Sequence, residues 1–224
     1  MAHFEIEIKS LLGQREAAEA LRDKLKATDA ESALVSTNRQ LNHYFEGGNI
    51  DALYQKVEHL FSPVEQEKLQ RVIEKGASFS VRTREKDGAV LVVVKASVDE
   101  GTSANTVSRL EFEEPVAVSL DALDRLVESA GYRYQAKWSR EREEYSYRGL
   151  NVCIDKNAGY GYLAEFEKVI DVEDQIASTR AEIEAVMAEL GVAELPQDRL
   201  ARMFDFYNNN WAEYYGTEKT FSIE

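Results

Sequence analysis

The chain has 224 residues, of which 44% are hydrophobic and 30% are charged, a composition typical of a globular protein with a sizeable core. Its formal net charge of −14 repels nucleic acid and anionic membranes, so neither is an expected partner. Cys153 is the only cysteine, which excludes an intrachain disulfide and a cysteine-rich zinc site. We see no signal peptide and no long apolar run, and therefore expect a cytoplasmic protein.

The first predicted strand, residues 3–9, alternates polar and apolar side chains. The two-residue period of a strand places Glu5, Glu7 and Lys9 on one face, with Phe4, Ile6 and Ile8 on the other. Two carboxylates and an ammonium in a row could hold a cation and an anion together. They could equally form the solvated face of an ordinary antiparallel strand.

The remaining chain alternates between helical and extended patterns. The helical periodicity predicts helices at 13–28, weakly at 51–59, and at 63–75, 119–130, 171–190 and 198–214. The helix at 63–75 begins with a capping box formed by Ser62 and Glu65. Further strands are predicted at 42–46, 78–84, 89–98, 106–114, 132–147, 151–156 and 162–170, with a flexible connection at 101–105.

These elements predict a single domain over residues 1–224 in the α+β class. About eight strands separated by turns favour one antiparallel sheet that could close into a barrel, with helices packed outside it. Residues 49–76 read as a helical insertion between strands, and residues 171–214 as C-terminal helices.

Charged residues occupy alternate positions on strand after strand, with both signs mixed. Seven are basic: Lys9, Arg82, Arg84, Lys95, Arg109, Arg140 and Arg142. Seven are acidic: Glu5, Glu7, Glu111, Glu113, Asp155, Glu165 and Glu167. One interpretation is a wet outer sheet face crossed by ion pairs. Because helices cover the apolar face of a sheet, the alternative is that the charged face lines the inside of a barrel.

A charged barrel interior needs polar contents, because unpaired buried charges are too costly. Divalent metal and polyphosphate would supply them, since carboxylates bind Mg²⁺ or Mn²⁺ and arginines grip phosphate oxygens with two bonds. The three histidines, His3, His43 and His59, show no metal-ligand spacing and are expected to have structural or surface roles.

The ordered set of charged motifs resembles a known family. Glu5-Ile6-Glu7-Ile8-Lys9 is similar to the Glu-x-Glu-x-Lys signature of the triphosphate tunnel metalloenzymes, the CYTH group. That group includes inorganic triphosphatases, thiamine triphosphatases and class IV adenylate cyclases. The resemblance continues in order through Arg82-Thr83-Arg84, Lys95, Glu111 with Glu113, Arg140 with Arg142, Asp155 and Glu165-Phe166-Glu167. Two features depart from the commoner pattern: the long insertion at 49–76 and the sequence Tyr44-Phe45-Glu46.

The resemblance implies an eight-stranded antiparallel tunnel that holds a linear triphosphate. Glu5, Glu7 and Lys9 are the expected catalytic residues. The expected substrate-binding residues are Lys9, Arg82, Arg84, Lys95, Arg109, Arg140 and Arg142. The expected ligands of Mg²⁺ or Mn²⁺ are Glu5, Glu7, Glu111, Glu113, Asp155, Glu165 and Glu167.

The resemblance leaves the substrate open. Inorganic triphosphate is the first expectation, since no base-recognition motif is evident. Thiamine triphosphate is next, and would need an aromatic platform such as Tyr44, Phe45 or Trp138. Cyclisation of ATP is the third alternative. A fourth alternative, which is not an enzyme, is a non-catalytic polyphosphate- or nucleotide-binding module. The protein is expected to act as a monomer or a homodimer on a small-molecule triphosphate.

Overall fold

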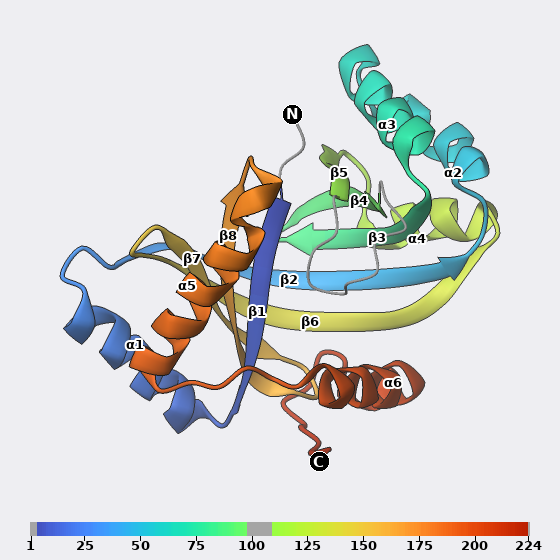
Figure 1. Ribbon diagram of the computed structural model, residues 1–224. Helices are drawn as coiled ribbons and strands as arrows, with labels where there is room; N and C mark the ends of the chain where they lie inside the picture. Colours follow the sequence, from blue (N-terminus) through green and yellow to red (C-terminus); the bar gives the residue numbers. More distant parts are fainter. Residues whose placement is uncertain (1–3, 98–108, 224) are drawn as a thin grey trace. The chain divides into compact units, whose positions relative to one another are not determined.

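The computed structural model describes residues 4–97 and 109–223, with only the backbone of Arg109 and Glu173 (Figure 1). Its strands are β1 (Phe4–Gly13), β2 (Ala33–Gly47), β3 (Ser78–Lys86), β4 (Ala89–Ser97), β5 (Arg109–Val116), β6 (Tyr132–Tyr147), β7 (Leu150–Asn157) and β8 (Gly161–Ile170). Its α-helices are α1 (Arg15–Thr28), α2 (Ile50–Val57), α3 (Pro63–Lys75), α4 (Leu120–Ser129), α5 (Ile176–Leu190) and α6 (Gln197–Tyr214). Two short 3₁₀ helices, η1 (Glu58–Leu60) and η2 (Glu173–Gln175), complete the list. The predicted connection at 101–105, the first residues of the strand predicted at 106–114, and His3 lie outside the described residues.

The eight strands form one sheet in the order β1-β8-β7-β6-β2-β3-β4-β5. The pairs with a described register are antiparallel. The predicted α+β fold with an eight-stranded antiparallel sheet is therefore confirmed. The sheet is not closed in the described residues, because β1 and β5 end the strand order and do not pair with each other.

The chain divides into two compact units, and β2 and β6 each contribute residues to both. Within the described residues, the first unit comprises 4–39 and 139–223, and the second comprises 40–97 and 109–138. The helices of the predicted insertion, α2 and α3, belong to the second unit, and the C-terminal helices α5 and α6 belong to the first.

The core of the first unit lies between its strands and the helices α1 and α5, which pack against β1 and β8. The alternation in β1 buries Ile6 and Ile8 in this core, at 2% exposure each. Helix α1 contributes Leu21 and Leu25, which are one turn apart and therefore share a helix face. The helix-covered face of β1 is thus the apolar one, as the sequence predicts.

The second unit has its own core, in which α3 packs against β4 and β5 and α4 packs against β3. Helix α3 begins with the predicted capping box: the Ser62 side chain accepts from the Glu65 amide and the Glu65 carboxylate accepts from the Ser62 amide. In β4 the apolar run is buried on both faces, because Val92, Val93 and Val94 are all at most 1% exposed.

Strand β2 is the element that sequence reasoning described least well. The predicted strand covers residues 42–46, whereas β2 runs from Ala33 to Gly47. Its first half contains Ser36, Thr37, Asn38 and Arg39, which lack an apolar alternation because neither face of this segment packs in a hydrophobic core. The segment is nevertheless part of the sheet, and one of its buried side chains, Asn38, is polar.

Candidate active site

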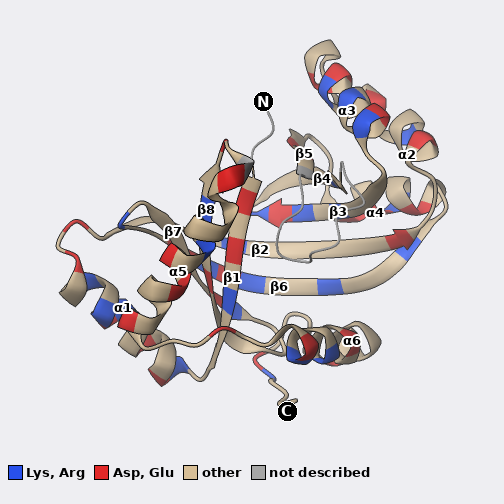
Figure 2. Cartoon of the chain, in the orientation of Figure 1, with Lys and Arg blue, Asp and Glu red and all other residues tan. Residues whose placement is uncertain are grey.

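The first unit brings most of its predicted site residues onto one sheet face, opposite its helices. Cross-strand register sets Glu7 of β1 directly opposite Glu167 of β8, and Lys9 opposite Glu165. On the next strand, Cys153 of β7 is opposite Glu165. Residues directly opposite one another in an antiparallel pair point to the same side, so the four charged side chains and the Cys153 thiol share one face. The charged residues of β1 appear as red and blue bands in Figure 2.

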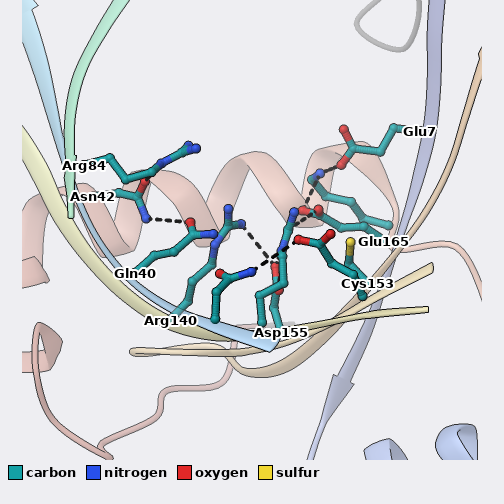
Figure 3. A network of polar contacts seen from close by, with 12 residues as sticks. Glu7, Gln40, Asn42, Arg84, Arg140, Cys153, Asp155 and Glu165 are labelled. Carbon is teal, nitrogen blue, oxygen red and sulfur yellow. Dashed lines mark hydrogen bonds and ion pairs between the residues drawn. The ribbon is translucent and has the colours of Figure 1, made fainter. Parts of the chain in front are cut away.

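Arg142 is the centre of the ion-pair network on this face, and its partners Asp155 and Glu165 are labelled in Figure 3. Its Nε donates to Asp155 Oδ1 at 2.7 Å and its Nη2 donates to Asp155 Oδ2 at 2.6 Å, which is a bidentate pair. The same Nη2 donates to Glu165. Arg140 Nη1 donates to Asp155 Oδ2 at 3.2 Å. Asp155 is only 1% exposed, so its charge is compensated by two arginines in the interior.

Lys9 links β1 to this network. Its Nζ donates to Glu165 Oε1 at 3.0 Å and also forms an ion pair with Glu7. The Glu165 carboxylate therefore lies between two cations, Lys9 and Arg142. We name Glu7, Lys9, Arg140, Arg142, Asp155 and Glu165 the arginine–carboxylate network.

The surroundings of this network shift the pKa values of its groups. Burial raises the pKa of Glu165, but the positive charges of Lys9, Arg142 and Arg140 outweigh it and lower that pKa to about 2. Burial also opposes the charge of Arg142, yet its bonds to Asp155 and the charge of Glu165 raise its pKa further above the ordinary value. Burial raises the pKa of Cys153 to about 12, so its thiol is not a nucleophile at neutral pH.

The second unit carries a comparable charged face on β3, β4 and β5. Arg84 Nε donates to Asn42 Oδ1 at 2.6 Å, and its Nη1 donates to both carboxylate oxygens of Glu113 at 2.8 and 2.9 Å. Lys95 Nζ lies 3.2 Å from Glu111 Oε2. The predicted acidic residues of β5 therefore serve as counter-ions to the predicted cations of β3 and β4.

Arg82 is held by an aromatic side chain. Its guanidinium carbon lies 4.3 Å from the centre of the Tyr44 ring, and its Nε donates to Ser80 Oγ at 3.2 Å. The Tyr44 ring also makes an edge contact with Trp138, with ring centroids 6.4 Å apart. Tyr44 and Trp138 are thus neighbours in the second unit. Both were proposed from the sequence as candidates for an aromatic platform.

Three predicted site residues remain. Glu5 and Glu167 lie in the first unit, and Arg109 has no described side chain. Glu5 lies on β1 with Glu7 and Lys9, opposite Val169 of β8, and it forms no hydrogen bond or ion pair with another described side chain. Glu167 lies on β8 opposite Glu7. The backbone of Arg109 pairs with Ser97 in β5, and its side chain lies outside the described residues.

The donor chemistry of the first unit fits a hard divalent cation. Its carboxylate oxygens are the ligands that Mg²⁺ and Mn²⁺ prefer. Asp155 and Glu165 are already compensated by arginine and lysine, whereas Glu5 has no such partner in the described chain. No three His, Cys, Asp or Glu side chains within the described ranges are grouped closely enough to form a ready-made metal site. The oxygen donors therefore fit the metal, but their positions would have to adjust on binding.

Sequence reasoning missed several polar residues that support these faces. Asn38, Gln40 and Asn42 of β2 are buried at 6%, 4% and 3% exposure, and Asn38 donates to Glu144 Oε1 at 3.3 Å. The signal was available, since three amides at alternate positions must share one strand face. His43, expected to be structural or exposed, is buried and donates to Asp124 of α4.

Comparison with known proteins identifies the family of this antiparallel sheet with its charged face. The CYTH domain family matches residues 73–199, more than half of the chain. This chain therefore belongs to the CYTH domain family. No curated protein matches the sequence significantly.

Solved structures share the fold at low sequence identity. A candidate adenylate cyclase from Vibrio parahaemolyticus is 16% identical with a TM-score of 0.59, covering 92% of this chain and 99% of its own. A protein from Pyrococcus furiosus is 17% identical with a TM-score of 0.58, covering 84% and 91%. A protein from Hippeastrum described as having a dominant triphosphatase activity is 15% identical with a TM-score of 0.51, covering 89% and 95%. None of the described helices is long and apolar enough to cross a membrane.

Proposed function

We propose that this protein is a divalent-metal-dependent triphosphatase whose preferred substrate is inorganic triphosphate. The observation that carries the proposal is the arginine–carboxylate network, which gathers cations and carboxylates of the predicted site on one sheet face in the first unit. Membership of the CYTH family and the triphosphatase activity described for the Hippeastrum protein support the same reading.

We assign the metal first to Glu5, Glu7 and Glu167. These three carboxylates lie on adjacent strands β1 and β8, and Glu7 is directly opposite Glu167. Asp155 and Glu165 are also proposed ligands, and both accept hydrogen bonds from cationic side chains, as Glu7 pairs with Lys9. Glu111 and Glu113 of the second unit are also proposed ligands, although Lys95 and Arg84 pair with them here. A bound Mg²⁺ or Mn²⁺ would act as a Lewis acid on a phosphoryl oxygen.

The cationic side chains of the chain would bind and orient the phosphate groups. Lys9 and Arg140 are the proposed phosphate contacts of the first unit, since both are cationic and lie in the arginine–carboxylate network. Arg142 is the least available, because its Nε and Nη2 are occupied by Asp155 and Glu165. Arg82, Arg84, Lys95 and Arg109 are the proposed contacts of the second unit.

The proposed catalytic residues are Glu5, Glu7 and Lys9, all on β1. A carboxylate of this strand would orient the attacking water and accept its proton, a role for which an ionised glutamate is suited. Lys9 would neutralise charge that develops on the phosphoryl oxygens during in-line attack. Its two carboxylate contacts, Glu7 and Glu165, fix the ammonium in place before substrate binds.

The proposal is tested by measuring phosphate release from inorganic triphosphate, thiamine triphosphate and ATP, each with Mg²⁺, Mn²⁺ or EDTA. We expect rapid metal-dependent release from inorganic triphosphate and loss of that release in EDTA. Faster release from thiamine triphosphate would reassign the substrate. Cyclic AMP and pyrophosphate from ATP would identify a cyclase. Binding of inorganic triphosphate without any turnover would show that the protein is a binding module and not an enzyme.

A further inference from the structure

A buried carboxylate on α4 collects hydrogen bonds from three strands of the second unit. Asp124 is 2% exposed. It accepts from His43 Nδ1 of β2 at 2.7 Å, from Thr83 Oγ1 of β3 at 2.6 Å and from the Tyr134 hydroxyl of β6 at 2.6 Å. Burial alone would raise the pKa of Asp124, but these three bonds outweigh it and lower that pKa, which keeps the carboxylate ionised.

Two of the three donors form one cross-strand pair. His43 and Thr83 are directly opposite each other in the β2–β3 register, and both side chains point toward α4. The pairs on either side of them point to the charged face, because side chains alternate along a strand. These flanking pairs are Asn42 with Arg84 and Tyr44 with Arg82.

Within each flanking pair, the two side chains are in contact. Asn42 accepts a hydrogen bond from Arg84, and the Tyr44 ring lies under the Arg82 guanidinium. Thr83, which lies between the two arginines in β3, donates to Asp124 on the opposite face of the sheet. The Asp124 carboxylate therefore holds the backbone segment that carries both arginines. A displacement of Thr83 would move Arg82 and Arg84 together, since both are its immediate neighbours in the chain.

Backbone pairing with β2 and β4 sets the register of β3, while the other side-chain contacts around Asp124 are apolar and non-directional. The buried neighbours of Asp124 on α4 include Leu123 and Val127, and the facing strands contribute Val81 and Val92. Apolar contacts of this kind have no preferred direction. Hydrogen bonds to an ionised carboxylate depend strongly on distance and angle, so they fix the placement of the His43 and Thr83 side chains relative to α4.

We propose that Asp124 is a positioning residue that sets the placement of the Arg82 and Arg84 side chains through His43 and Thr83. The inference rests on the proposed function only where it concerns substrate, because Arg82 and Arg84 are the proposed phosphate contacts. Asp124 itself touches no substrate; it acts through the strands.

The test compares Asp124→Asn, Thr83→Val and Thr83→Ser with the wild-type protein by NMR of the arginine Nε–Hε groups. The Arg84 Nε–Hε group is a good probe, because it donates to Asn42 at 2.6 Å. Valine matches the shape of threonine and removes one of the three donors. If Asp124→Asn does not fold, Thr83→Val therefore still decides the outcome. Serine retains the hydroxyl and should restore the wild-type signal.

Tyr134→Phe is the matched control. This substitution also removes one hydrogen bond to Asp124, but the lost donor belongs to β6. The bonds from His43 and Thr83 to Asp124 remain. We expect Thr83→Val to shift or broaden the Arg84 signal, with Tyr134→Phe and Thr83→Ser leaving it in place. An unchanged Arg84 signal in folded Thr83→Val protein would overturn the proposal, and so would an equal shift in Tyr134→Phe.

The kinetic readout distinguishes positioning from a general loss of stability. We expect Thr83→Val to raise the KM for inorganic triphosphate about tenfold with little change in kcat, the size expected from weakening one charge-assisted hydrogen bond. A lower melting temperature with an unchanged KM would also contradict the proposal. If the wild-type protein hydrolyses no triphosphate, the proposed function fails, while the NMR comparison still decides the role of Asp124.

Discussion

Glu165 shows how the surroundings of one side chain can control its charge. Its carboxylate accepts from Lys9 at 3.0 Å and also from Arg142, so that it remains ionised despite its burial. Since its pKa is lowered from 4.5 to about 2, the ionised form stabilises the folded state above about pH 4.5. That stabilisation is lost as the pH falls through the pKa of the folded state.

We predict a specific pH dependence for Glu165→Gln. Between pH 4.5 and pH 2, the free energy of unfolding of the wild-type protein should fall more steeply than that of the variant, because only the wild type must protonate this carboxylate. Denaturant titrations at several pH values measure the difference. Glu213→Gln, at an exposed position on α6, is the control and should follow the wild-type slope. Parallel curves for Glu165→Gln and the wild type would contradict the account.

The residues of the charged faces could be predicted from sequence, but their partners could not. Alternation along each strand placed Glu7 and Lys9 on one face, and the register then confirmed that face. The choice of Asp155 and Glu165 as partners of Arg142 depends on the alignment of β6, β7 and β8. Alignment between strands is set by turns and packing that a single strand pattern does not contain.

The C-terminal segment illustrates an interaction between elements of the first unit. The Phe221 amide donates to the Gly159 carbonyl at 2.8 Å, and the Gly159 amide donates to the Lys219 carbonyl at 3.1 Å. The Phe221 ring packs against Tyr160 and Phe206, with centroids 5.3 and 4.6 Å away. The segment after α6 is thereby fixed to the turn between β7 and β8.

We predict that Gly159→Ala weakens this attachment. A Cβ at Gly159 would lie 2.8 Å from ring atoms of Tyr207 and Phe221, and φ at this position is +81°. Gly149→Ala is the matched control, because its φ is +77° but no atom lies within 4 Å of the added Cβ. The control should lose about 1 kcal/mol of stability from the left-handed backbone alone. Gly159→Ala should lose clearly more, because a crowded site adds a cost of about 1–3 kcal/mol.

Melting temperatures and hydrogen exchange at the Phe221 amide measure this prediction. Faster exchange in Gly159→Ala, with slow exchange retained in Gly149→Ala, is the expected pattern. Equal stability losses and equal exchange rates would mean that the close contact with the aromatic rings is unimportant.

At the scale of the elements, sequence patterns predicted most helices and strands but not their full lengths. The capping box located the start of α3, whose first residue is Pro63. The first half of β2 was missed because its residues carry no apolar alternation. The role of Asp124 was missed as well, although an aspartate four residues after Leu120 and three before Val127 falls on the apolar face of α4.

At the scale of the whole molecule, the same division of faces occurs in both units. In each, helices cover an apolar face and the predicted charged residues occupy the other. The chain nevertheless has a net charge of −14, which opposes the approach of a polyanion. Local clusters of Lys and Arg, together with a divalent cation, are the physical means by which such a protein could bind a triphosphate.

The most direct test of the central claim is metal-dependent phosphate release from inorganic triphosphate by Glu167→Gln, Glu7→Gln and Glu182→Gln. Glu182 of α5 is the control, since it pairs with Lys168 of β8 and belongs to the helical side of the same unit. Glu7→Gln and Glu167→Gln should each lower kcat at least about 100-fold with the melting temperature retained, and Glu182→Gln should match the wild type. Wild-type turnover by folded Glu7→Gln and Glu167→Gln would contradict the claim that this charged face is the catalytic centre.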